Sequence, residues 1–199
     1  IAKWDGANWN AVGSGVSGPE PVSCLAISPT GLVYIGGAFT SIGGDPNCNH
    51  IAYWDGSSWN PLSTGLNGNV YALKTMSATI PRGSLVGGLL IGGKFTSADG
   101  TNGDYICYWN GTEFKSFYDL GATELTGPIT GYVRSIDVTP NSTIVIGGSF
   151  TNAGGDPNAD YVAAWRGTNW GALQAGGVNN TVRKVYCDPN SDIYLAGSF

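Results

Sequence analysis

Short apolar runs, several of them alternating with polar residues, follow one another along the chain and are separated by Gly, Pro, Asn and Asp. The first complete set of runs covers Val22 to Ile27, Leu32 to Ile35, Ile51 to Trp54 and Trp59 to Leu62. Runs this short between turn-forming residues are typical of β-strands, because helices need longer segments with a helical period. We therefore expect each set to form four antiparallel strands in sequence order.

The same set of runs recurs along the chain, and a tryptophan motif fixes its period. An apolar run ends in a Trp, a turn containing Gly follows, and a second aromatic residue comes five positions after the Trp. The Trp is found at Trp4, Trp54, Trp109 and Trp165, and the second aromatic residue at Trp9, Trp59, Phe114 and Trp170. The repeated units therefore start near residues 1, 51, 106 and 162, and we expect residues 1–199 to form one repeat domain.

A second motif consists of two small residues, mostly Gly-Gly, followed two positions later by Phe. Its first small residue is Gly36, Gly92, Gly147 and Ala196, and the apolar strand ahead of it begins at Val22, Val70, Val133 and Val182. A single four-stranded unit cannot cover both of its own faces, so such units must stack on their neighbours. The repeat predicts an all-β fold, a β-propeller of four-stranded antiparallel blades.

The Gly pair, the Trp-Asp-Gly turn and the second aromatic residue together resemble the kelch repeat. They are most similar to the Trp-Asp-Gly form found in tandem arrays of large extracellular, cell-surface and viral proteins. The resemblance covers essentially the whole chain. It implies that the Gly pair allows close packing of strands and that the Trp wedges between blades. It also implies an extracellular, cell-surface or virion location.

The two ends of the chain carry half-units, since it opens with the third and fourth strands of a unit and closes with the first and second. Paired as one blade, these halves would close a four-bladed ring. Alternatively, the residues belong to a longer array and to a larger ring, which is favoured because the turn that follows Phe39, Phe95 and Phe150 has no counterpart after Phe199. Both alternatives are propellers, and they differ in the number of blades.

Charge excludes some classes of partner. The formal net charge is -5, and the nine Lys and Arg residues are scattered along the sequence, with Arg183-Lys184 as the single adjacent pair. A nucleic-acid or anionic membrane surface calls for a basic stripe, which this sequence lacks. The apolar stretches are too short and too often broken by Gly to span a bilayer. We expect neither nucleic-acid binding nor membrane insertion.

Residues for catalysis or redox chemistry are few. His50 is the one histidine, so a paired-histidine metal site is excluded, and a half-exposed structural role is favoured for it. The four cysteines show no C-x-x-C spacing; Cys107 and Cys187 replace apolar residues and are expected to be core thiols, while Cys24 and Cys48 could pair in an oxidising compartment. We therefore expect no catalytic residues and no cofactor.

Two further features suggest ligands or modification. Asp45, Asn47, Asp156 and Asn158 lie in recurring Gly-rich loops and offer the oxygen ligands that Ca²⁺ takes, although Asx turns that satisfy the backbone are the favoured explanation. Three sequons, at Asn110, Asn141 and Asn179, would accept glycans in a eukaryotic secretory route.

Function is best sought where the four copies differ, because loops on a rigid scaffold commonly carry binding sites. The insertion of the second unit supplies Ile80 and Arg82, and the long connection after it supplies Phe117, Tyr118 and Asp119. We predict a non-enzymatic binding or structural module with a protein or glycan partner, which could be part of a larger assembly. The alternatives are a glycan-processing enzyme on a propeller scaffold and a calcium-binding adhesion module.

Overall fold

The computed structural model describes residues 1–16, 21–76, 88–117, 129–174 and 177–199. In these ranges the chain folds into β-strands that pair in antiparallel sheets, with one short 3-10 turn at Ala153–Gly155. The prediction of an all-β protein is therefore confirmed.

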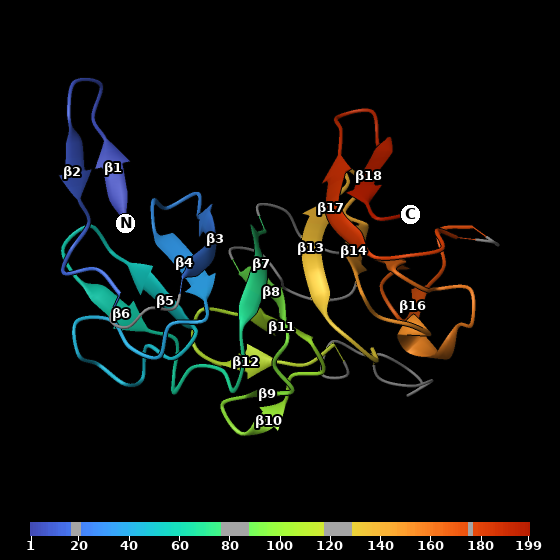
Figure 1. The fold of residues 1–199 in the computed structure, drawn as a ribbon, viewed down its shortest axis with the longest axis horizontal. Helices are drawn as coiled ribbons and strands as arrows, with labels where there is room; N and C mark the ends of the chain where they lie inside the picture. The colour runs from blue at the N-terminus through green and yellow to red at the C-terminus, as the bar shows by residue number, and fades with distance from the viewer. Residues whose placement is uncertain (17–20, 77–87, 118–128, 175–176) are drawn as a thin grey trace.

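Three sheets contain four strands each, in the sequence order that the repeat predicts (Figure 1). The first sheet comprises β3 (Val22–Ile27), β4 (Val33–Gly37), β5 (Ile51–Trp54) and β6 (Trp59–Pro61). The second sheet comprises β7 (Val70–Thr75), β8 (Leu89–Gly93), β11 (Ile106–Trp109) and β12 (Phe114–Lys115), with a small hairpin of β9 (Ser97–Ala98) and β10 (Thr101–Asn102) between β8 and β11. The third sheet comprises β13 (Val133–Val138), β14 (Ile144–Gly148), β15 (Val162–Trp165) and β16 (Trp170–Gly171).

The two half-units form separate two-stranded sheets at opposite ends of the molecule. β1 (Ala2–Trp4) pairs with β2 (Trp9–Ala11), and β17 (Val182–Cys187) pairs with β18 (Ile193–Gly197). Figure 1 shows the first pair beside the first sheet and the second pair beside the third sheet, with the rest of the protein between them. Among the described residues, β1 does not pair with β18, so the four-bladed closure considered from the sequence does not form.

The first strands of successive units lie next to one another through the middle of the molecule. β3 contacts β7, β7 contacts β13, and β13 contacts β17. We call these four strands the inner strands. Each stands at the edge of its own sheet, so one side of its backbone lies outside the sheet's hydrogen-bond ladder.

The first Gly of each Gly pair makes room for the next sheet. A Cβ on Gly36 would lie 2.4 Å from Cγ1 of Val70, and a Cβ on Gly92 would lie 2.5 Å from Cγ1 of Val133. Gly147 meets Val182 in the same way. Each sheet therefore places its first Val against the glycine of the sheet before it, which is the close packing expected from the repeat.

The recurrent aromatic residues pack between sheets where a preceding sheet is present. Trp109 and Phe114 belong to a buried cluster that includes Tyr34 and Ile51 of the first sheet. Trp165 and Trp170 likewise share a cluster with residues of the second sheet. At the N-terminal end the same positions are open, because Trp4 is 50% exposed and Trp9 is 71% exposed. The recurrent aromatic residues are therefore buried as wedges only where a neighbouring sheet covers them.

All four cysteines are free thiols, so the pairing of Cys24 with Cys48 that the sequence left open is not formed. Burial raises the pKa of Cys24 to about 12, and that of Cys187 to about 11. Burial raises the pKa of Cys48 to about 11 as well, and it also raises that of Cys107, whose side chain is fully buried. The expected core role of Cys107 is confirmed, whereas Cys187 is only half-buried.

We expect the thiols to be nearly inert in the folded protein, because the thiolate is the reactive form and burial disfavours it. A thiol-labelling reagent at pH 8 should modify the four cysteines rapidly in urea and slowly in buffer. The raised pKa values also mean that only the unfolded chain loses these protons as the pH rises above about 9. The free energy of unfolding should therefore fall as the pH rises from about 9 toward 11, and it should fall more gently in a Cys24→Ala variant. Rapid labelling of Cys24 in the folded protein would contradict the expected low reactivity of the thiols.

Candidate functional site

The inner strands enclose a cavity of about 370 Å³, which we call the inner-strand groove. It is lined by Ser23, Cys24 and Leu25 of β3, Tyr71, Ala72 and Leu73 of β7, Arg134, Ser135 and Ile136 of β13, and Arg183 and Lys184 of β17. A second cavity of about 510 Å³ shares Leu25 and Leu73 with it and continues along β3 and β7 toward Pro29 and Thr75. The site is therefore built by residues from all four units.

A β-bulge at the same place in each inner strand shapes the groove. The register shifts between Val22 and Cys24, and equivalent shifts occur in β7, β13 and β17. The residues skipped by the ladder are Ser23, Tyr71, Arg134 and Arg183. A bulge re-aims a side chain, and here each of the four lines the groove. A Val precedes the bulge in every unit, and Val70, Val133 and Val182 pack against a glycine of the sheet before them, whereas the bulged residue varies.

The groove is rich in positive charge. The Cζ atom of Arg134 lies 5.5 Å from the centre of the Tyr71 ring, and its Nε atom is buried without a hydrogen-bond partner in the described structure. Arg183 Nε donates to Ser198 Oγ at 3.4 Å, and both Arg183 and Lys184 are exposed. Within the described ranges, the ion pairs are Lys74 with Asp137 and Lys115 with Glu113. Arg134, Arg183 and Lys184 therefore have no carboxylate partner there.

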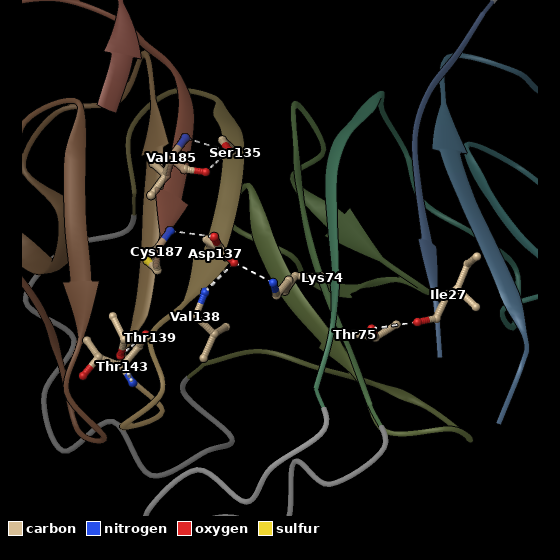
Figure 2. Close-up of polar contacts among 10 residues, drawn as sticks. All are labelled: Ile27, Lys74, Thr75, Ser135, Asp137, Val138, Thr139, Thr143, Val185 and Cys187. Atoms are coloured by element: carbon tan, nitrogen blue, oxygen red, sulfur yellow. Dashed lines mark hydrogen bonds and ion pairs between the residues drawn. The ribbon is translucent and has the colours of Figure 1, made fainter. Parts of the chain in front are cut away.

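Asp137 is the one acid on an inner strand, and it is already engaged (Figure 2). Its Oδ1 lies 2.6 Å from Lys74 Nζ and accepts a hydrogen bond from the Val138 amide, and its Oδ2 accepts one from the Cys187 amide at 2.8 Å. Burial alone would raise the pKa of Asp137, but Lys74 and the two amides outweigh it and hold the pKa below its usual value. This carboxylate joins β7, β13 and β17.

Further hydrogen bonds tie the inner strands together (Figure 2). Thr75 Oγ1 donates to the Ile27 carbonyl at 3.0 Å, which connects β7 to β3. The Val185 amide donates to Ser135 Oγ at 3.0 Å, which connects β17 to β13. Polar contacts between units therefore hold the walls of the groove in place. A preorganised groove binds a ligand more tightly than a flexible one, because less conformational freedom is lost on binding.

Sequence reasoning missed this cluster of cations. The nine Lys and Arg residues are scattered along the chain, yet Lys74, Arg134, Arg183 and Lys184 meet on three neighbouring strands. A signal was present, since aligning the four copies places Arg183 opposite Arg134, directly after the recurrent Val. Functional differences between the copies were expected in loops, but the copies also differ at these positions within strands.

Of the binding residues expected in the unit-specific loops, Phe117 is the one that the structure describes. Ile80, Arg82, Tyr118 and Asp119 lie outside the described residues. Phe117 is buried, with its ring centre 5.0 Å from those of both Trp165 and Trp170, so it is a core residue and cannot contact a ligand at the surface. The sequon residues are exposed: Asn110, Asn141 and Asn179. His50 is half-buried and does not line the groove.

The loops proposed for calcium use their carboxylates in turns. Asp45 Oδ1 accepts a hydrogen bond from the Asn47 amide at 2.9 Å. Asp156 Oδ1 accepts one from the Asn158 amide, and its Oδ2 accepts one from the Ala172 amide, both at 2.9 Å. Three or more His, Cys, Asp or Glu side chains do not come together as a metal site anywhere in the described ranges. The geometry matches the Asx turns that the sequence favoured.

Calcium removal is accordingly expected to leave the protein unchanged. The thermal transition measured with excess chelator should coincide with that measured in millimolar CaCl₂, because Asp45 and Asp156 already satisfy backbone amides. A ligand that binds the folded state raises the transition temperature in a concentration-dependent way. An upward shift with calcium that disappears in an Asp156→Asn variant would instead establish a site in this loop.

Comparison with known proteins adds a likeness in fold. No protein-family model and no curated protein matches the chain. Among the solved structures that match is the "extracellular domain of the putative one component system BT4673 from B. thetaiotaomicron", which aligns with a TM-score of 0.53 at 17% sequence identity. The alignment covers 90% of this chain and 20% of that one, so the chain spans about a fifth of the length of its structural neighbour. In the described residues, no helix is both long and apolar enough to cross a membrane.

Proposed function

We propose that this chain is a non-catalytic binding module of an extracellular protein, built on a propeller-type repeat, and that its ligand binds in the inner-strand groove. The observation that carries the proposal is the bulge in each inner strand. It turns one residue per unit toward the groove, and these residues are a serine, a tyrosine and two arginines: Ser23, Tyr71, Arg134 and Arg183.

The contrast between repeated and varied positions supports a binding role. Positions that pack between sheets keep one residue type, as with Val70, Val133 and Val182 against their glycines. Selection for packing alone gives no reason for the neighbouring bulged position to gather different polar side chains around one cavity. Several polar groups converging in a largely preformed cavity are typical of ligand sites.

The propeller assignment is supported by the order of the sheets. Their first strands follow one another through the middle of the molecule, and each sheet packs on the next with the same Gly and Val contact. Both terminal half-sheets expose aromatic residues at positions that are covered in the interior: Tyr194 is 57% exposed, whereas its counterpart Tyr34 is 5% exposed. We propose that further sheets cover these faces and complete a larger ring.

An extracellular location agrees with the structural neighbour, which is an extracellular domain. It also agrees with the likeness to repeats of extracellular arrays. The four free cysteines are compatible with it, since Cys48 and Cys107 are buried and the half-buried Cys24 and Cys187 have raised pKa values.

A blocking substitution tests the site. Saccharides and peptides would be screened against the immobilised protein, and each bound compound would be measured again with Ser23→Trp, which places a large ring at an exposed position of the groove. We expect Ser23→Trp to abolish binding and Thr40→Trp, at an exposed loop position away from the groove, to preserve it. Full binding by Ser23→Trp would place the ligand site elsewhere and refute the proposal.

A further inference from the structure

We infer that the ligand of the inner-strand groove is an acidic saccharide, whose carboxylate or sulfate is held by Arg134, Arg183 and Lys184. The inference rests on the proposed function and adds the chemical class of the ligand. It is argued from three properties of the groove: its unpaired charge, the place of that charge along the groove, and the other groups in its walls.

The charge is concentrated and unneutralised. Two guanidinium groups and one ammonium line a cavity of about 370 Å³, and none of them has an ion pair with a described acid. Like charges repel one another, most strongly where solvent is partly excluded. An anion bound among the three cations relieves this repulsion and is attracted by each of them. Guanidinium groups also match the planar geometry of a carboxylate and bind it through two parallel hydrogen bonds.

Arg134 carries a hydrogen-bond donor that has no partner among the described residues. Its Nε is buried without a hydrogen-bond partner in the described structure, and its guanidinium stacks on Tyr71. Buried donors are nearly always paired in native proteins, because an unpaired one loses its hydration without compensation. An oxyanion bound beside the Arg134 guanidinium would offset its unpaired positive charge.

The place of the charge argues for one acidic group on an otherwise neutral ligand. The second cavity, which continues along β3 and β7, is lined by uncharged residues and by Lys74, which is already bound to Asp137. The uncharged residues are Leu25, Ala26, Ile27, Ser28, Pro29, Leu73 and Thr75. A polyanion such as nucleic acid needs cations along its whole length. Here the unpaired cations stand at one end, and the section beside them has no unpaired charge among its described residues.

The remaining groups suit a sugar. Tyr71, Leu25 and Leu73 offer an aromatic ring and apolar surface to the C–H faces of a pyranose. The Ser23 hydroxyl and the inner strands, each at the edge of its sheet, offer hydrogen-bonding groups to sugar hydroxyls. A cavity of about 370 Å³ lies in the range of about 300–1,000 Å³ that holds small ligands. One or two sugar rings would fill it.

The test measures calorimetric affinities for four probes: a disaccharide of one galacturonic acid and one galactose, galactobiose with a single sulfate, neutral galactobiose and a tetra-aspartate peptide. Inorganic sulfate serves as the anion without a sugar. We expect at least one acidic disaccharide to bind at least about tenfold more tightly than galactobiose, the peptide or sulfate, and to weaken as salt rises from about 50 to 500 mM. The better of the two acidic disaccharides identifies the acidic group.

Variants locate the binding. Arg183→Gln removes an exposed cation and should weaken the acidic disaccharide about tenfold, and Arg134→Gln with Arg183→Gln about a hundredfold. Lys94→Gln makes the same change of charge away from the groove, where Lys94 lies over Tyr132, and should stay within about twofold. A melting curve accompanies each variant, and Arg183→Gln alone decides the matter if the double variant does not fold.

The outcomes separate the inference from the proposed function. The inference that the ligand is an acidic saccharide would be overturned by equal affinity for galactobiose, by a preference for the peptide, or by binding that Arg183→Gln leaves unaffected. If Ser23→Trp still abolished binding in these cases, the groove would remain the ligand site. Binding of none of the probes would overturn the ligand class. The broader screen with Ser23→Trp would then decide separately whether the groove binds anything.

Discussion

Replacing Asp137 with alanine is expected to lower the free energy of unfolding by about 3 kcal/mol, with a range of about 2–5 kcal/mol. The Asp137 side chain is the acceptor for the backbone amides of Val138 and Cys187 and the partner of Lys74. Its loss leaves two donors inside the stack of inner strands without acceptors. Lys74, which is 41% exposed, can turn toward water and recover part of the loss. Urea denaturation followed by tryptophan fluorescence measures the effect.

The control for Asp137 uses the other ion pair of the described structure. Glu113→Ala breaks the pair with Lys115 at the outer edge of the second sheet, where the Glu113 side chain is 58% exposed. Exposed pairs contribute little, so this variant should lose at most about 1 kcal/mol. Similar losses for both variants would show that Asp137 does not tie the inner strands together.

The pH dependence of stability gives a second measure of Asp137. Its pKa is below the usual value in the folded protein, so the folded state favours the charged form relative to the unfolded chain. This contribution is present above pH about 4 and is lost as the pH falls through that region. The parent protein should therefore lose more stability between pH 5 and 3, roughly, than Asp137→Asn, in which this titration is absent. If stability falls equally with pH in the parent and in Asp137→Asn, the lowered pKa of Asp137 does not contribute to stability.

Replacing Gly147 with alanine is expected to cost about 3 kcal/mol, because it forces two sheets apart. The new Cβ would lie 2.5 Å from Cγ1 of Val182 and 2.7 Å from Cγ2 of Val185, both on β17. Gly171→Ala is a matched control in the same unit, since its Cβ would find its nearest atom, Asp156 Oδ2, at 3.6 Å. Denaturation of both variants should show a large loss for the first and little change for the second.

A double variant identifies the cause of the Gly147 effect. If the contact with Val182 is responsible, Val182→Ala should be less harmful in the Gly147→Ala background than in the parent. If the losses of stability in the two single variants add up in the double variant, the effect of Gly147 comes from its backbone conformation and not from the contact with Val182. Ala196 occupies the equivalent position in the last unit, where no following sheet packs in the described structure.

The sheets were predictable because their determinants are local and repeated. Short apolar runs, the Trp turn and the Gly pair lie within single units, so four copies of the pattern report the same four strands. The Asx turns at Asp45 and Asp156 follow from the residues themselves, since the side chain reaches the amide two positions along. Phe117 was misjudged because its burial depends on Trp165 and Trp170, which belong to the next sheet.

The sequence by itself determined the repeat, the antiparallel strands, the order of strands in each sheet and the identity of the packing residues. These are periodic features, and each copy confirms the others. The tertiary structure decided that the half-units stay apart and that Arg134, Arg183 and Lys184 share one groove. Charges from different units become neighbours only when the sheets stack. The bulge sets the direction of each side chain, and the packing of the sheets determines which side chains lie beside it.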